Sequence, residues 1–225
     1  MREFAVIGLG RFGLRVAAGL YEYGADVIAV DTDADKVDDA KSLATTAIQL
    51  DATDEAALRT VNVQELDAVV VAIGKDMEAS ILVTALLKQL GARQIIARGT
   101  TPIHARILEL VGADRVVYPE DEGAARLARS LHSPHILDHV DLSGDLDLAQ
   151  IIAPEACVGK SLRELDLRAR FQVNVVTVRP AGDEGLDDQG RPAYSVPDAD
   201  YVIRTGDTLV VIGTPEAINE LDRLT

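Results

Sequence analysis

Three glycines near the start of the chain have the spacing of a phosphate-binding turn. Gly8, Gly10 and Gly13 fit the pattern G-x-G-x-x-G. Such glycines permit a tight turn, let backbone approach a phosphate and let the next helix pack closely on the preceding strand. A helix that begins there directs free N–H groups and partial positive charge at an anion. The apolar run 4–7 before the turn and the helical pattern after it strengthen this otherwise weak motif.

An acidic residue follows at the position where a ribose would need one. Asp31 ends the second apolar run, 21 residues after Gly10. A carboxylate there accepts hydrogen bonds from both ribose hydroxyls and repels a 2′-phosphate, which disfavours NADP. The alternative is that Asp31 caps the next helix.

Further candidates follow the other apolar runs. The carboxyl ends of parallel strands line the ligand crevice of a doubly wound sheet. There Asp51 would face the adenosine or cap a helix, and Arg98 would bind phosphates or form a surface ion pair. The candidate nucleotide-binding residues are Gly8, Gly10, Arg11, Phe12, Gly13, Asp31, Thr32, Asp51, Ala52, Thr53, Ala72, Ile73, Gly74 and Arg98.

The elements that must position these residues alternate between strand and helix. Helical patterns separate six apolar runs, at 4–7, 27–30, 47–50, 68–73, 94–97 and 115–118. Continuous apolar strands are buried on both faces, and right-handed crossovers between them give a doubly wound parallel sheet. The sequence therefore predicts a Rossmann-like α/β domain over residues 1–119.

The pattern changes after Tyr118. We expect a connecting helix over 122–131 and a break at Ser133 and Pro134, so that residues 120–137 form a connector and hinge. Beyond it the elements are irregular from Asp138. The later predictions are strands at 146–152, 173–178 and 208–212, helices at 162–168 and 215–224, and a loop at 181–197. Residues 138–225 then form a second, smaller α+β domain.

Charge and composition exclude several classes of function. The 225 residues include 22 basic and 37 acidic side chains, a formal net charge of −15. Such acidity opposes binding to nucleic acid or to an anionic membrane face. No apolar run approaches the ~20 residues of a membrane span, so we expect no direct membrane insertion. The single cysteine, Cys157, forms no intrachain disulfide, which favours a reducing compartment such as the cytoplasm.

Four strings of residues are more specific than the glycines. They are FAVIGLGRFG at 4–13, Val30-Asp31, VAIG at 71–74 with Ala79-Ser80, and GADRVVYPE at 112–120. In these strings the chain resembles the cytoplasmic regulatory subunits of Ktr/Trk-type bacterial potassium transporters, the RCK proteins. The resemblance covers nearly the whole chain and is greatest to the Ktr type, which has one pair of RCK domains per chain.

The resemblance implies a regulatory role. Four dimers would form a homo-octameric ring beneath an integral membrane subunit that translocates potassium, at the inner face of the cell membrane. ATP would favour the active state and ADP the inactive state, with NAD or NADH as alternative occupants of the cleft. By position, Arg11 would reach the γ-phosphate held by a neighbouring protomer. Glu120 would bind a divalent or monovalent cation at the dimer interface.

The second domain resembles one that binds cyclic di-AMP between two protomers in some relatives. The positions that match that site are Leu162, Arg168, Ala169, Arg170, Phe171 and Pro197. The chain departs from the pattern at Gln172, where relatives often have glycine after the aromatic residue.

Two other classes of function are alternatives for a chain with this nucleotide-binding pattern. An NAD-dependent oxidoreductase needs an acid/base group and a substrate pocket beyond the cofactor. His132, His135 and His139 gather at the predicted hinge without a metal-ligand pattern, so we interpret them as a solvated connector. A nucleotide-sensing transcription factor needs a basic recognition helix, and acidic residues interrupt the stretch 163–170. We therefore expect no enzymatic activity, with an NAD-dependent oxidoreductase or an NAD(H)-sensing regulator as the alternative.

Overall fold

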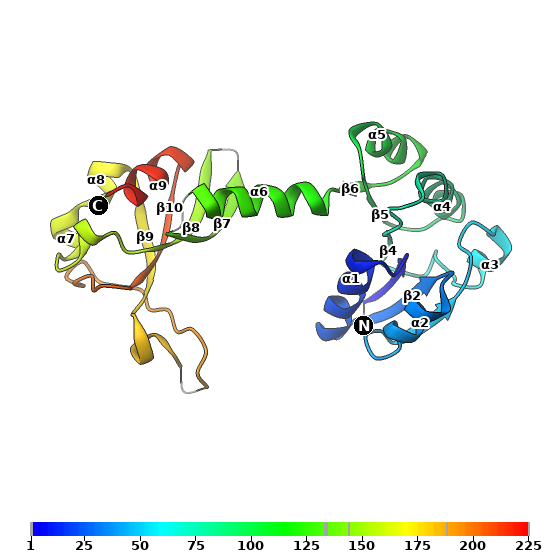
Figure 1. Ribbon diagram of the computed structural model, residues 1–225, viewed down its shortest axis with the longest axis horizontal. Helices are drawn as coiled ribbons and strands as arrows, with labels where there is room; N and C mark the ends of the chain where they lie inside the picture. The colour runs from blue at the N-terminus through cyan, green and yellow to red at the C-terminus, as the bar shows by residue number, and fades with distance from the viewer. Residues whose placement is uncertain (1, 133–134, 144, 188, 225) are drawn as a thin grey trace. The chain divides into compact units, whose positions relative to one another are not determined.

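The computed structural model describes residues 2–132, 135–143, 145–187 and 189–224. The chain divides into two compact units, Met1–Glu122 and Gly123–Thr225 (Figure 1). Among the described residues, no helix has the length and apolar character needed to cross a membrane. The predicted break at Ser133 and Pro134 lies outside the described residues.

The first unit is built on a six-stranded sheet in the order β3-β2-β1-β4-β5-β6. Every pair of neighbouring strands is parallel, which confirms the predicted doubly wound sheet. The strands are β1 (Glu3–Ile7), β2 (Asp26–Asp31), β3 (Thr46–Gln49), β4 (Ala68–Val71), β5 (Ile95–Arg98) and β6 (Arg115–Val117).

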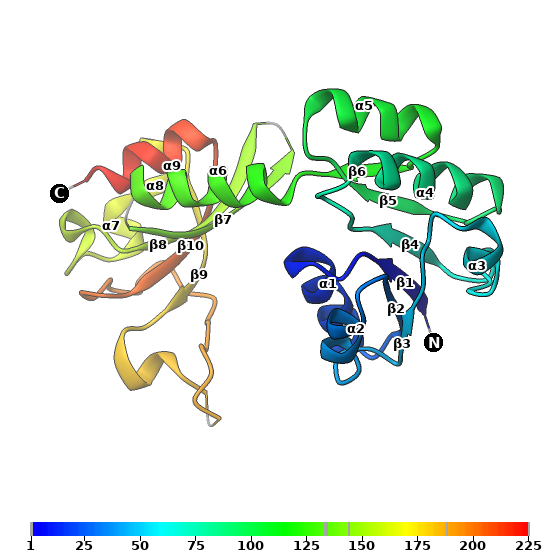
Figure 2. The same cartoon turned by 45° about the vertical axis from the view of Figure 1, so that its right-hand side comes forward.

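Helices cover both faces of this sheet (Figure 2). They are α1 (Arg11–Glu22), α2 (Ala34–Ala40), α3 (Glu55–Arg59), α4 (Met77–Gln89) and α5 (Pro102–Val111). One apolar core packs under α3, α4 and α5 and includes Leu58, Leu87 and Leu108. A second core packs under α1 and α2 and includes Ala17 and Val37. Burial on both faces explains why these strands are continuously apolar in sequence.

The strand order reverses direction at β1 and β4. The chain moves outward from β1 to β2 and β3 and then returns to place β4 on the other side of β1. Loops that leave the carboxyl ends of β1 and β4 therefore diverge to opposite faces, and in doubly wound sheets this is the place where ligands bind. The glycine turn and the segment Ala72–Gly74 follow these two strands directly.

The second unit contains a four-stranded antiparallel sheet in the order β7-β8-β10-β9. Helix α6 (Pro119–His132) begins in the first unit and continues into the second. The remaining elements are β7 (Ile136–Ser143), β8 (Leu146–Ile152), α7 (Leu162–Leu165), α8 (Leu167–Phe171), β9 (Asn174–Arg179), β10 (Thr208–Gly213) and α9 (Pro215–Asp222), with 3₁₀ turns at Glu155–Cys157 and Gly182–Gly185.

Three details differ from the sequence prediction. Helix α6 begins at Pro119 rather than at 122, because proline is well suited to the first helical position. The helix predicted over 162–168 is two short helices, separated where Asp166 takes a left-handed conformation (φ 41°). Strand β7 was not predicted, since its polar residues are interspersed without a clear apolar alternation.

Candidate functional site

The glycine turn has the geometry that its spacing predicts. Gly8 has φ +96°, where L side chains are strained, and a Cβ there would lie 3.0 Å from the Ile73 amide nitrogen. A Cβ on Gly13 would overlap the carbonyl oxygen of Gly8. At Gly10, by contrast, a Cβ would meet nothing within 4 Å. Packing within the chain therefore requires glycine at positions 8 and 13 but leaves the side of Gly10 open to an approaching ligand.

Helix α1 begins directly after this turn without a side-chain cap. Its N-cap residue is Gly10, no acidic side chain lies in its first turn, and Arg11 at its first position is exposed. The other helices of the sheet's crossovers are capped by side chains, such as Asp33 on α2 and Asp76 on α4. The first amides of α1 and the adjoining guanidinium thus suit an anion.

Asp31 is nearly buried and connects the end of β2 to the glycine turn. Its Oδ2 accepts a hydrogen bond from the Leu9 amide at 2.7 Å, and its Oδ1 accepts one from the Asp33 amide at 2.9 Å. Only 9% of the surface of Asp31 is exposed to solvent. Burial raises the pKa of the Asp31 carboxyl, but these hydrogen bonds and the Lys36 ammonium outweigh burial and bring the pKa below its ordinary value. The carboxylate is therefore charged at neutral pH.

Lys36 is a residue of this site that the sequence did not indicate. Its Nζ lies 3.3 Å from Oδ1 and 3.4 Å from Oδ2 of Asp31, and 3.5 Å from Oδ2 of Asp33. Partial burial lowers the pKa of Lys36, while the two carboxylates raise it, and the balance is a raised pKa. One feature of the sequence could have pointed to Lys36: it is a lone lysine on an acidic helix, five positions after Asp31.

The turn that follows β3 is polar and lies at the edge of the sheet formed by the carboxyl ends of the strands. Asp51 is exposed and accepts hydrogen bonds from the Thr53 hydroxyl at 2.6 Å and the Thr53 amide at 3.0 Å. These bonds lower the pKa of Asp51. The alternative role of Asp51 as a helix cap is wrong, because Asp54 caps α3. Ala52 is buried, and the exposed Thr32 accepts a bond from the Gln49 amide group through its carbonyl.

Arg98 joins the glycine turn, the end of β4 and the start of α6. Its guanidinium lies over the Phe12 ring, with Cζ 6.0 Å from the ring centroid. It also lies so close to Gly74 that a Cβ there would overlap Nη1. Nη2 donates to Oε1 of Glu120, so the predicted ion-pair alternative is present. The Arg98 Nε is buried and has no partner among the described residues.

The structure thus brings most of the predicted nucleotide-binding residues to one edge of the first unit. Gly8 to Gly13, Asp31 and Arg98 are linked by the contacts above, while Ala72 and Ile73 touch the glycines from the end of β4. Polar groups of opposite charge stand at two ends of this edge: the Asp31 carboxylate at one, and the Arg98 guanidinium at the other. A ribose suits the former and phosphates suit the latter.

The candidate second-ligand residues lie mainly on α7 and α8. Leu162 begins α7 and is partly buried, while Arg168, Ala169 and Arg170 are exposed on α8. The Arg170 guanidinium lies over the Phe171 ring, 5.2 Å from its centroid. Gln172 ends α8 in a left-handed conformation (φ 57°), which explains why glycine suits that position. Pro197 lies in the loop after β9, away from α8 in sequence.

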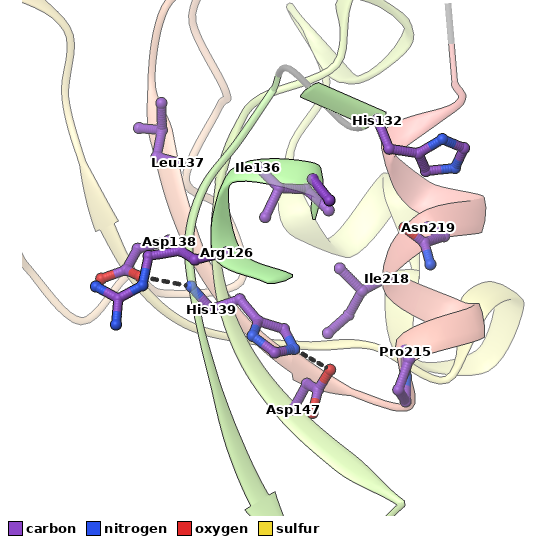
Figure 3. A pocket seen from close by; sticks show the side chains of 11 residues that line it. Arg126, His132, Ile136, Leu137, Asp138, His139, Asp147, Pro215, Ile218 and Asn219 are labelled. Carbon is purple, nitrogen blue, oxygen red and sulfur yellow. Dashed lines mark hydrogen bonds and ion pairs between the residues drawn. The ribbon is translucent and has the colours of Figure 1, made fainter. Parts of the chain in front are cut away.

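The histidines near the predicted hinge take different positions. His139 lies in β7, and its Nε2 is 2.6 Å from Oδ2 of the buried Asp147. This pair faces a mostly apolar cavity of about 330 Å³ between α6, β7, β8 and α9, with His132 at the far side (Figure 3). His139 is therefore not part of a solvated connector. In the part of the chain that the structure describes, no three potential ligands lie together as a metal site would require.

Comparison with known domain families covers both units. Residues 4–119 match the TrkA-N domain, which is more than half of the chain, and residues 148–225 match the TrkA-C domain.

The chain belongs to the TrkA-N/TrkA-C family.

Whole-chain relatives in this family are named for potassium uptake. The chain is 37% identical to Ktr system potassium uptake protein C of Bacillus subtilis (strain 168), over 99% of this chain and 96% of the relative. It is 33% identical to Ktr system potassium uptake protein A of the same organism, over 98% and 96% of the two chains. The family resemblance predicted from the glycine turn and the GADRVVYPE string is confirmed. None of these names denotes an enzyme.

Solved structures agree on the fold. The GsuK channel aligns with 99% of this TrkA-N/TrkA-C chain and 39% of its own, with a TM-score of 0.67 and 18% identity. The NAD(P)-binding domain of an exopolyphosphatase-related protein from Archaeoglobus fulgidus aligns with 59% of this chain and 98% of its own, with a TM-score of 0.52 and 25% identity. The first likeness places both units in the RCK fold, which confirms the predicted architecture.

Proposed function

We propose that this chain is the nucleotide-sensing regulatory subunit of a potassium uptake system. The observation that carries the proposal is the meeting of the glycine turn, Asp31 and Arg98 at the carboxyl ends of one parallel sheet. Relatives aligned over nearly the whole chain are named as Ktr system potassium uptake proteins, which supports the transport process. The first unit senses the nucleotide, and the bound nucleotide sets the activity of the transporter.

The ligands in this proposal are ATP and ADP, with ATP favouring the active state and ADP the inactive one. Asp31 accepts the ribose hydroxyls, and Arg98 with the first amides of α1 binds phosphates. Arg11, exposed at the tip of α1, reaches the γ-phosphate held by the neighbouring protomer. Loss of that phosphate then changes the geometry of the dimer. Coupling between sites in proteins is typically about 1–3 kcal/mol, and a ring of sites multiplies it.

The partners are further copies of this chain and a membrane subunit. In the proposal, four dimers form an octameric ring on the cytoplasmic face of an integral membrane subunit that translocates potassium. The relatives named for potassium uptake support the link to potassium transport, and the ring is part of the proposal. The membrane-spanning segments belong to the partner, and Glu120 contributes to a cation site, divalent or monovalent, at the dimer interface.

NAD(H) is a second candidate ligand for the same cleft. The pairing of G-x-G-x-x-G with an acid at the end of β2 is the arrangement that binds the adenosine ribose of NAD. The 25% identity to an NAD(P)-binding domain from Archaeoglobus fulgidus also favours it. In that case the chain is an NAD(H)-sensing regulator rather than an oxidoreductase, in keeping with relatives named for potassium uptake.

Cyclic di-AMP is the proposed second ligand, at α7 and α8 of the second unit. Exposed Arg168 and Arg170 supply positive charge for its phosphates, and Phe171 supplies an aromatic face for a base. Leu162, Ala169 and Pro197 supply apolar contacts.

Thermal unfolding with ATP, ADP, NADH and cyclic di-AMP on one preparation tests the assignments together. A ligand at 100 times its Kd adds about 2.7 kcal/mol to stability, so ADP and ATP should raise the midpoint clearly. Asp31→Ala should remove most of the nucleotide effect and spare that of cyclic di-AMP. Arg11→Ala should narrow the difference between the midpoint shifts that ATP and ADP produce. A chain whose midpoint does not move with millimolar ATP, ADP or NADH would refute the nucleotide site.

A further inference from the structure

The guanidinium of Arg98 is shared between the candidate phosphate site and a helix. Arg98 ends β5, and its Nη2 donates to Oε1 of Glu120, the second residue of α6. Helix α6 begins in the first compact unit and continues into the second. The side chain that faces the glycine turn therefore also holds the first turn of the helix that leaves this unit.

The other contacts of Arg98 point toward a ligand. The guanidinium lies over Phe12 of the glycine turn and against Gly74, with no space for a side chain at that glycine. Its Nε is buried without a partner in the described part of the chain. A buried donor without a partner is costly, and a phosphate oxygen would satisfy it. Arginine often binds phosphate through two parallel N–H···O hydrogen bonds, and the guanidinium of Arg98 could bind a phosphate in this way.

We propose that Glu120 is a positioning residue that competes with the phosphates of the nucleotide for Arg98. Arg98 pairs with Glu120 in this structure, and phosphate binding exchanges that partner, which frees the first turn of α6. The inference rests on the proposed nucleotide site and extends it: nucleotide binding changes the contacts at the start of the helix that connects the two units.

Burial and charge favour such an exchange. The side chain of Glu120 is 63% exposed, whereas the side chain of Arg98 is 20% exposed. Ion pairs with one exposed partner contribute little, so the pair is easily broken. The carboxylate that is released stays in the first turn of a helix, where negative charge is favourable, and becomes available to the cation proposed at the dimer interface. Arg98 meanwhile exchanges a single carboxylate oxygen for a phosphate with more negative charge.

Calorimetric titration of the full chain with ADP, in EDTA so that no divalent cation takes part, tests the competition. Glu120→Gln should raise the affinity for ADP about two- to fivefold, the worth of an exposed ion pair. Adenosine, which lacks phosphates, should bind wild type and variant equally. Glu122→Gln is the matched control, since it removes the same charge from the same helical turn and its carboxylate has no ion pair among the described residues.

A double-mutant cycle separates competition from a general charge effect. In the Arg98→Met background, Glu120→Gln should leave ADP affinity unchanged. Hydrogen exchange at the amides of residues 122 and 123, which have acceptors in the first turn of the helix, should also quicken when ADP binds the wild type. The proposal is overturned if Glu120→Gln leaves ADP affinity unchanged, or raises it equally in the Arg98→Met background. If the wild type does not bind ADP at all, the proposed function itself fails, and the titration reports that failure separately.

Discussion

Asp31 is the residue on which the candidate nucleotide site depends most. Its carboxylate holds the Leu9 amide of the glycine turn and the Asp33 amide, and it pairs with Lys36. The same two oxygens would accept the ribose hydroxyls, so Lys36 must share them or move when a nucleotide binds. Sequence predicted Asp31 because its distance from the glycines is fixed by one strand-helix-strand unit. It did not predict Lys36, because that contact depends on how the chain turns between β2 and α2.

The lowered pKa of Asp31 predicts how stability changes with pH. Its folded pKa is below its unfolded value of about 3.9, so ionisation stabilises the fold above that value. This contribution is lost as pH falls through the folded pKa. Asp31→Asn should therefore reduce the free energy of unfolding at pH 6–7, and the deficit should shrink below about pH 4. Urea unfolding of both proteins between pH 3 and 7 measures it, and a deficit that does not depend on pH would contradict the electrostatic account.

At the scale of elements, the alternation of strands and helices in the first unit follows directly from the sequence. Buried parallel strands must be apolar throughout, and the capped helices between them carry clear start signals such as Asp54 and Thr101. The second unit was harder to predict. Strand β7 includes Asp138 and His139, and the His139 side chain is stabilised by Asp147 on the neighbouring strand, a contact that local sequence patterns do not contain.

The turn between β1 and α1 gives a matched pair of glycine substitutions. Gly10→Ala should leave the fold intact, because a Cβ there meets nothing and the backbone angles (φ −66°, ψ −180°) are open to alanine. It should weaken ADP binding at least tenfold, because the methyl group blocks the approach of a phosphate. Gly13→Ala should destabilise the chain by about 1–3 kcal/mol, since its Cβ overlaps the Gly8 carbonyl.

Chemical unfolding and ADP titration of the two variants check this pair. Equal ADP affinity in wild type and Gly10→Ala would show that the open side of the turn does not face the ligand.

At the scale of the whole molecule, the chain combines a Rossmann-like unit that matches the TrkA-N domain with a second unit that matches the TrkA-C domain. The net charge of the chain is −15, so places where basic side chains gather are candidate sites for anionic ligands. Arg11 and Arg98 stand at the glycine turn, while Arg168 and Arg170 stand together on α8. Each unit therefore presents positive charge where an anionic ligand is proposed. Only the fold brings Arg98 beside Phe12.

The proposed ring predicts the mass of the protein in solution. Light scattering should give about eight times the 24.1 kDa mass of one chain. A chain that stays monomeric with and without ATP would contradict an arrangement in which Arg11 completes the site of its neighbour.

In the proposed function, the nucleotide bound at the glycine turn controls the rate of potassium transport. Potassium flux into proteoliposomes, with this chain bound to the membrane subunit that co-purifies with it, measures this control. Flux should be faster with ATP than with ADP, and the two nucleotides should give equal flux when the chain carries Asp31→Ala. Equal flux with ATP and ADP in the wild-type complex, at nucleotide concentrations that saturate the chain, would contradict this proposal.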